Sequence, residues 1–319
     1  MLYAWRVLGA RLDPVPLGGD LAQAVWIDLY RPMPDQIAAV QAFGVEIPTL
    51  ADMEEIEISN RLYREGGADY MTVVLPGLSE TKEATSGPVT FILTADRLIT
   101  VRHHAPRPFE TYPTRAEKVG PGCADAARTF LSLIEEIVGR LADLLEGSGR
   151  SLDALTRQVF HEGAEAQDAA LRTSLANVAR ESDLVGRVRL SLLTLERAVS
   201  FFGQALGDRP MAEGLRPAVK GLMRDIQALE VHADFLTSRV AMASDVTLGM
   251  VNLAQNRTVK IVSVVAVLFL PPTLIASLYG MNFARMPELG WTWGYPMAVA
   301  MMIGSGLCTY LFFKWKKWL

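Results

Sequence analysis

The sequence is poor in cysteine and histidine, and this scarcity excludes several kinds of site. The two cysteines, Cys123 and Cys308, fall in a predicted soluble helix and in an apolar run, so they build neither a disulfide framework nor a cysteine-based zinc site. The four histidines show no metalloprotease spacing, and the sequence has no phosphate-binding glycine loop. We expect the adjacent pair His103-His104 to be solvated at a strand end. The residues therefore predict no enzyme and no prosthetic group.

Charge is absent from two long apolar runs near the C-terminal end. Residues 261–279 and 294–313 contain no Asp, Glu, Lys or Arg, and as helices both can cross an apolar bilayer core of about 30 Å. Arg257 and Lys260 precede the first run, and three lysines follow the second. Because basic residues stay on the cytoplasmic side, we expect a multi-pass protein of the plasma (inner) membrane with both termini in the cytoplasm.

The acidic residues lie almost entirely in the other part of the chain. Residues 251–319 contain six basic residues and one acidic residue, a net charge of +5, so the total of −4 leaves −9 on residues 1–250. An acidic soluble part argues against nucleic-acid binding. The N-terminal residues also lack the uninterrupted apolar core of a signal peptide, so export of residues 1–250 is not expected.

The first third of the chain predicts an α/β domain. Residues 1–115 mix short β-branched and aromatic runs with proline and glycine, and they include a helical stretch near residues 35–43. The run at 97–102 follows the run at 89–93 closely, which predicts a hairpin with its turn at Ala95-Asp96. We interpret this segment as a cytoplasmic domain built on a small sheet.

Long amphipathic helices follow. Residues 116–207 predict a helical hairpin, in which Gly147-Ser148-Gly149 marks a point where the first helix bends or ends. A more regular seam comes next and requires another helix against it. It consists of Leu215, Val219, Leu222, Ile226, Leu229, Ala233, Leu236 and Val240. Pro217 is tolerated only in a first turn, so we expect this helix to begin near Arg216 and to continue into the first apolar run.

The predicted fold class is thus an α+β membrane protein with a long stalk helix continuous with the first of two transmembrane helices. After the α/β domain and the hairpin, the predicted segments are a stalk helix at 208–255, a pore-lining transmembrane helix at 256–279, an external loop at 280–293, a second transmembrane helix at 294–313 and a basic cytoplasmic tail at 314–319.

Two spans cannot enclose a water-filled path, so conduction would require an oligomer in which one span lines a shared axis. The first span carries a polar stripe, in which Asn256, Ser263 and Ser277 recur at multiples of seven. Such a stripe should face protein or water. Helix–helix contact is the alternative for the two serines. The pair Pro271-Pro272 either frees carbonyl oxygens that line a path or simply kinks the helix.

The end of this span carries a recognisable pattern. Tyr279-Gly280-Met281-Asn282-Phe283 is followed by Met286-Pro287-Glu288-Leu289 and by Trp293-Gly294-Tyr295-Pro296. The match continues upstream in Asn256-Arg257-Thr258-Val259-Lys260 and in Leu270-Pro271-Pro272-Thr273. With these motifs the chain resembles the CorA family of magnesium transport proteins, strongly from about residue 250 onward and weakly over the rest.

The resemblance implies a homopentamer embedded in the lipid bilayer. It implies that Gly280, Met281 and Asn282 form the external selectivity filter, in which the Asn282 carboxamide and the Gly280 carbonyl contact the water shell of a divalent cation, as Asn256 does further inside. The pore-facing residues would be Asn256, Val259, Ser263, Leu270 and Thr273. Glu288, the acid of the external loop, would concentrate cations there.

The implied function is influx of hydrated Mg2+, with Co2+ and Ni2+ as further ions, down the electrochemical gradient. Intracellular Mg2+ would also be the regulatory ligand that closes the channel. For that site we name Glu80, Glu83 and Asp225, because the aligned stalk position carries Gly221 instead of an acid. The alternatives are a zinc transporter of the ZntB type and a membrane-tethered cation sensor or scaffold.

Overall fold

The computed structural model describes residues 1–16, 18–162, 168–206, 212–281 and 286–316. The chain divides into two compact units. The first comprises Met1–Arg157 and Ala176–Ser244, and the second comprises Gln158–Leu175 and Asp245–Leu319.

A seven-stranded sheet forms one side of the first unit, in the order β2-β1-β3-β7-β6-β5-β4. Its strands are β1 (Leu2–Leu8), β2 (Arg11–Pro14), β3 (Trp26–Tyr30), β4 (Leu62–Glu65), β5 (Ala68–Leu78), β6 (Ala84–Leu93) and β7 (Leu98–Arg102). The pair β3–β7 is parallel and all other neighbours are antiparallel. The hairpin predicted around Ala95-Asp96 is present as β6–β7, and the sheet is larger than the small one expected.

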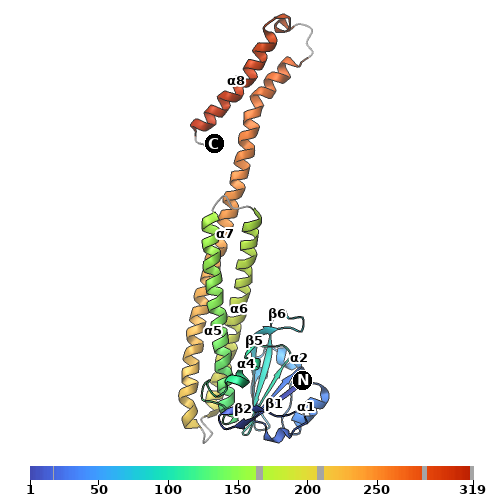
Figure 1. Ribbon diagram of the computed structural model, residues 1–319, viewed down its shortest axis with the longest axis vertical. Coiled ribbons are helices and arrows are strands. Elements are labelled where there is room, and N and C mark those ends of the chain that lie inside the picture. The colour runs from blue at the N-terminus through green and yellow to red at the C-terminus, as the bar shows by residue number, and fades with distance from the viewer. Residues whose placement is uncertain (17, 163–167, 207–211, 282–285, 317–319) are drawn as a thin grey trace. The chain divides into compact units, whose positions relative to one another are not determined.

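Helices cover both faces of this sheet (Figure 1), so β7 is buried throughout and β3 is buried except at Tyr30. The short helices are η1 (Leu21–Gln23), α1 (Pro34–Gln41), α2 (Leu50–Glu54), α3 (Ile58–Arg61) and α4 (Pro108–Arg115). Side chains alternate between two cores, as the strand period of two requires. Trp26 and Phe91 face the core shared with α4 and the long helices, whereas Ile27 and Ile92 face the core on the side of α1 and α2.

Three long helices lie side by side in the first unit (Figure 1): α5 (Ala126–Glu162), α6 (Asp168–Ala205) and the first part of α7 (Ala212–Tyr279). The seam predicted on α7 lies in their common core, with Leu215, Ile226 and Ala233 fully buried. Contacts of the seam with both α5 and α6 place it in this core. A Cβ on Gly203 of α6 would lie 3.3 Å from Val219, and one on Gly149 of α5 would lie 3.6 Å from Leu236.

The expected helix start near Arg216 is wrong, and so is the alternative that the first long helix ends at Gly147-Ser148-Gly149; the alternative of a bend there stays a prediction. Helix α5 continues through Gly147-Ser148-Gly149 to Glu162, and α7 begins at Ala212 and contains Pro217. Pro217 removes one backbone donor close to the helix start. The burial of Leu215 and Val219 on either side of the proline offsets this loss. The fold class predicted from the sequence is nevertheless confirmed, because α7 extends without interruption from the bundle into the first apolar run.

A buried ion pair joins the two parallel strands. Arg102 of β7 donates from Nη2 to Asp28 of β3 at 2.9 Å, and both side chains are at most 6% exposed. The Thr100 hydroxyl also donates to Asp28 at 2.7 Å, while the Arg102 guanidinium lies over the rings of Tyr30 and Phe109. Strong hydrogen bonds on every side make this burial of charge tolerable.

The expectation that His103-His104 is solvated is wrong for His104, which is 5% exposed. Its Nε2 atom lies 2.9 Å from the Leu75 carbonyl oxygen, and its ring fills the space left by two glycines. A Cβ on Gly77 or Gly87 would approach the ring to 2.7 or 2.9 Å. Burial and the nearby charge of Arg102 lower the pKa of His104 to about 4, so the ring is neutral at pH 7.

We predict that Asp28→Asn lowers the free energy of unfolding by about 3–5 kcal/mol, because it leaves the Arg102 charge buried without its partner. The matched control is Asp13→Asn, which breaks the half-exposed pair between Arg6 and Asp13 and should change stability by about 0–1 kcal/mol. Thermal and denaturant unfolding of the full chain in detergent measures both. Equal effects of the two substitutions would contradict the role of the buried pair.

A second prediction concerns pH. The pKa of His104 is about 4 in the folded chain against 6.5 for an ordinary histidine, so the unfolded chain binds more protons between these values. The free energy of unfolding should therefore fall as the pH drops from 6.5 toward 4, by about 3 kcal/mol at most. Melting curves from pH 7 to 4.5 test this: His104→Asn should show a weaker fall, and exposed His232→Asn should keep it. An unchanged fall in His104→Asn would refute the assignment.

Candidate functional site

The second unit contains two helices that are long and apolar enough to cross a membrane. One is the C-terminal part of α7 and the other is α8 (Gly294–Trp315); the short helix η4 (Pro287–Gly290) precedes α8. In the most apolar 18-residue stretch of each helix, only 6% and 11%, respectively, is buried inside the chain. A core helix of a soluble protein would be mostly buried, so these two helices have the character of bilayer spans.

Helix α8 contacts one side of α7. A Cβ on Gly306 of α8 would lie 3.7 Å from Cγ of Pro272. On the same side of α7, Val264 is 7% exposed, and Pro271 and Ile275 are half-buried. The side chains that α7 turns toward α8 are thus apolar.

The predicted pore-facing residues occupy the opposite side of α7. Because a helix turns about 100° per residue, they share one face about 100° wide, whose centre lies roughly 120° from Val264 and 160° from Pro272. Every member of this set is exposed in the single chain, and the set comprises Asn256, Val259, Ser263, Leu270 and Thr273. Ser277 lies on the same face and is also exposed. The structure thus brings the five residues onto one face, which α8 leaves uncovered.

The polar members of this face have few partners in the chain. Thr273 donates its hydroxyl to the Phe269 carbonyl oxygen at 2.6 Å. Within the described residues, the side chains of Asn256, Ser263 and Ser277 make no hydrogen bond. An uncovered carboxamide and hydroxyls on a membrane helix need protein or water beside them.

Two consecutive prolines interrupt the hydrogen bonding of α7. Pro271 and Pro272 have no N–H group, so the carbonyl oxygens of Val267 and Leu268 lose their helical donors. The helix nevertheless continues to Tyr279. Both interpretations of the proline pair, a local bend and carbonyl oxygens that line a path, remain predictions.

The predicted filter begins where α7 ends. The Gly280 N–H donates to the Ala276 carbonyl oxygen at 2.9 Å, and a Cβ at Gly280 would approach that oxygen to 3.1 Å, a tight contact. The next residue, Met281, is 46% exposed. Asn282 lies outside the described residues. Glu288 falls in η4.

The three acids named for a regulatory site lie on different elements of one chain. Glu80 is in the turn between β5 and β6 and pairs with Arg31 at 2.9 Å, while the Glu83 N–H donates to Ser79 in the same turn. Asp225 is exposed on α7. The described residues contain no group of three or more His, Cys, Asp or Glu side chains able to hold a metal. Within a single chain the three acids do not assemble, and a site shared between subunits stays a prediction.

An apolar stripe that the sequence prediction did not include lies on the other side of α7 in the first unit. Val231, Phe235 and Met242 are 71%, 56% and 58% exposed, and they lie opposite the buried seam. Their spacings of four and seven residues were visible in the sequence. Exposed apolar side chains in line on one helix are typical of a surface that another protein covers.

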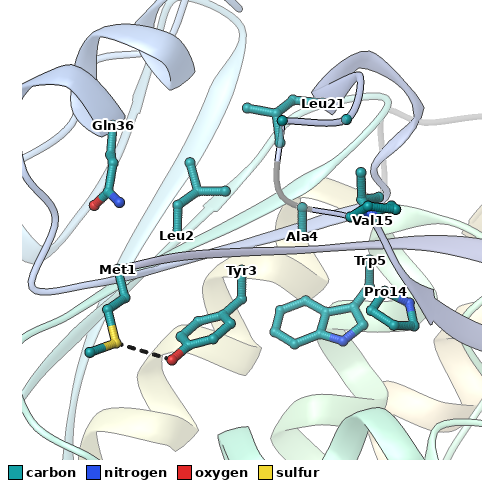
Figure 2. A pocket seen from close by; sticks show the side chains of 12 residues that line it. Met1, Leu2, Tyr3, Ala4, Trp5, Pro14, Val15, Leu21 and Gln36 are labelled. Atoms are coloured by element: carbon teal, nitrogen blue, oxygen red, sulfur yellow. Dashed lines mark hydrogen bonds between the residues drawn. The ribbon is translucent and has the colours of Figure 1, made fainter.

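An apolar pocket of about 550 Å³ runs along β1, the strand next to the edge strand β2. Figure 2 shows Met1, Tyr3 and Trp5 along this strand, with the Tyr3 hydroxyl donating to the Met1 sulfur at 3.2 Å. Gln36 contributes an amide from α1, and no lining residue has a charged side chain. The pocket is therefore unsuited to a cation. None of the residues predicted for the filter, the pore face or the regulatory site lines it.

Comparison with known proteins gives a consistent result. The family model described as "CorA-like Mg2+ transporter protein" matches residues 22–316. The chain is 36% identical to the magnesium transport protein CorA of Yersinia pseudotuberculosis serotype I (strain IP32953) and 35% identical to that of Escherichia coli (strain K12), each over 100% of both chains.

Solved structures show the same fold. The complete CorA magnesium transporter of Methanocaldococcus jannaschii superposes with a TM-score of 0.73 at 17% identity, over 100% of this chain and 99% of that one. The ZntB cytoplasmic domain of Vibrio parahaemolyticus gives 0.54 at 14% identity, over 80% and 97%.

Proposed function

The chain belongs to the family of CorA-like Mg2+ transporter proteins, and from that membership we propose that it is a channel-type transporter through which hydrated Mg2+ enters the cytoplasm. The observation that carries the proposal is the uncovered face of α7, which combines the polar Asn256 and Ser263 with the apolar Val259 and Leu270. A membrane anchor has no need of such a face. In an oligomer it would surround a shared, water-filled axis.

Neutral oxygen atoms suit a hydrated magnesium ion. Mg2+ gives up its water reluctantly, so rings of carboxamide and carbonyl oxygens can hold it through its first water shell. In the proposed path, Gly280, Met281 and Asn282 form the outer ring and Asn256 an inner ring. Between them, rings of Val259 and Leu270 form an apolar constriction that can lose its water and close.

The driving force needs no nucleotide hydrolysis. A doubly charged ion gains roughly 4.6 kcal/mol per 100 mV when it moves to the negative side of the membrane. Arg257 and Lys260 near one end of the α7 span and Lys314 at the end of α8 support an orientation with both termini in the cytoplasm of a plasma (inner) membrane protein. Glu288 would then be external and concentrate cations there.

We propose further that the chain assembles as a homopentamer. The support is the apolar stripe of Val231, Phe235 and Met242, which the chain itself leaves exposed. Its position on the same helix as the polar face favours an assembly in which copies of α7 meet along one axis.

Gating by intracellular divalent cation follows from the same assembly. Glu80, Glu83 and Asp225 could meet between subunits, and a cation bound there would favour the closed state. Co2+ and Ni2+ are further proposed substrates. A ZntB-like zinc transporter and a membrane-tethered sensor are the alternatives, and flux measurements separate them.

We predict that Asn282→Ala abolishes selective Mg2+ influx into proteoliposomes loaded with a magnesium-sensitive dye, because it removes the carboxamide ring. Wild-type influx should increase with an inside-negative potential. The matched control is Asn177→Ala, which removes the same group from α6 and should leave influx unchanged. Flux that requires a proton gradient and prefers zinc, or no flux from folded protein, would refute the magnesium channel.

A charge on the exposed stripe of α7 should prevent assembly. We predict that Phe235→Glu converts the oligomer to smaller species in detergent, because the carboxylate would be buried without a partner. The control is Leu8→Glu, which changes a leucine of β1 that is likewise exposed, at 64%. This substitution should leave the oligomer intact. Light scattering coupled to size exclusion measures the mass, and an unchanged Phe235→Glu oligomer would contradict the stripe as an interface.

A further inference from the structure

A polar hollow of about 510 Å³ lies between α4 and the first part of α5. Arg107, at the N-cap of α4, and Thr111 and Arg115 within it follow one another at intervals of four, so they lie on one side of this helix. Lys118 extends this wall beyond the helix end, and Arg140 contributes from α5. The hollow therefore presents four cationic side chains, although residues 1–250 together carry a charge of −9.

One of these cations is already neutralised. Glu136 of α5 is 9% exposed and accepts from the Arg115 guanidinium at 2.9 Å and from the Thr111 hydroxyl at 2.8 Å. This triad ties the two helices together at one side of the hollow. It leaves Arg115 with little positive charge to offer a ligand.

The other charged groups have no such partner. Within the described residues, Arg107, Lys118 and Arg140 form no ion pair, and neither do Glu135 and Asp143, which also line the hollow. Arginine forks match phosphate oxygens in pairs, and lysine is a strong point charge for phosphate. Three free cationic side chains around one hollow thus suit the binding of a ligand with several phosphate charges.

We propose that this hollow binds the Mg2+ complex of a nucleoside triphosphate. The three free cations take the phosphate oxygens, and Glu135 and Asp143 take the metal ion that the phosphates carry. Proteins usually hold Mg2+ in this way, by one or two carboxylates together with phosphates. The described residues contain no cluster of acids able to hold the bare ion.

Size distinguishes a nucleotide from a free phosphate. Small-molecule sites typically enclose about 300–1,000 Å³, so 510 Å³ suits a nucleotide and exceeds what one phosphate requires. Gly139 leaves part of the wall open, because a Cβ there would meet nothing within 4 Å. Pro108 and Val119 also line the hollow, but both are largely buried and offer a base or sugar only a small apolar patch.

Calorimetry on the full chain in detergent tests the proposal with three probes: ATP with Mg2+, ATP with EDTA, and inorganic phosphate with Mg2+. We expect saturable binding of MgATP, weaker binding of ATP without the metal, and no comparable binding of phosphate. Arg140→Gln and Lys118→Gln should each weaken MgATP binding about tenfold or more, since each removes a charged hydrogen bond. The control is Arg180→Gln, which changes an exposed arginine of α6 outside the hollow.

Several results would overturn the proposal. They are the absence of saturable MgATP binding by folded wild-type protein, equal weakening by Arg180→Gln and Arg140→Gln, and phosphate binding as tight as that of ATP. Melting curves of each variant exclude loss of folding, and Arg107→Gln, at an exposed position, provides a further substitution. The assay requires no ion flux, so its failure and a failure of the proposed transport are distinguishable.

Discussion

A polar side chain inside a bilayer must meet protein or water, and the interpretation of this chain depends on that constraint. Helix α8 covers the apolar side of α7 around Pro272 and leaves the side with Asn256 and Ser263 uncovered. One chain has only two spans among its described residues, so it offers nothing else to cover that face. In the proposed channel-forming oligomer, other copies of the chain and water along a shared axis would meet that need.

Much of the fold could be predicted from the sequence because the relevant signals are local. Uncharged runs predict the two spans, a short interval between β-branched runs predicts the β6–β7 hairpin, and a heptad seam predicts the buried side of α7. The errors have non-local causes. Packing against neighbouring helices carries α5 through its glycines and α7 through Pro217, and His104 is buried because two glycines on β5 and β6 make room for its ring.

The candidate site, too, could be predicted from the sequence only in part. Periodicity places Asn256, Val259 and Leu270 on one face, since a helix needs only its own spacing to define that face. Contacts between side chains on different elements cannot be predicted from such spacing. Neither the contact of Glu80 with Arg31 nor the hollow between α4 and α5 follows from any spacing, because each joins residues that only the folded chain brings together.

The chemistry of the ion also explains why the proposed path contains so few charges. A ring of carboxylates would hold a doubly charged ion tightly and would favour stripping its water, at a large cost for Mg2+. Carboxamide and carbonyl oxygens offer only dipoles, so the hydrated ion enters and leaves readily under the membrane potential. Discrimination then depends on the size of the hydrated ion and hence on the spacing between copies of α7. In the proposed oligomer, the contacts that would hold those copies together, including the stripe of Val231, Phe235 and Met242, would therefore be as important for selectivity as the residues that touch the water shell.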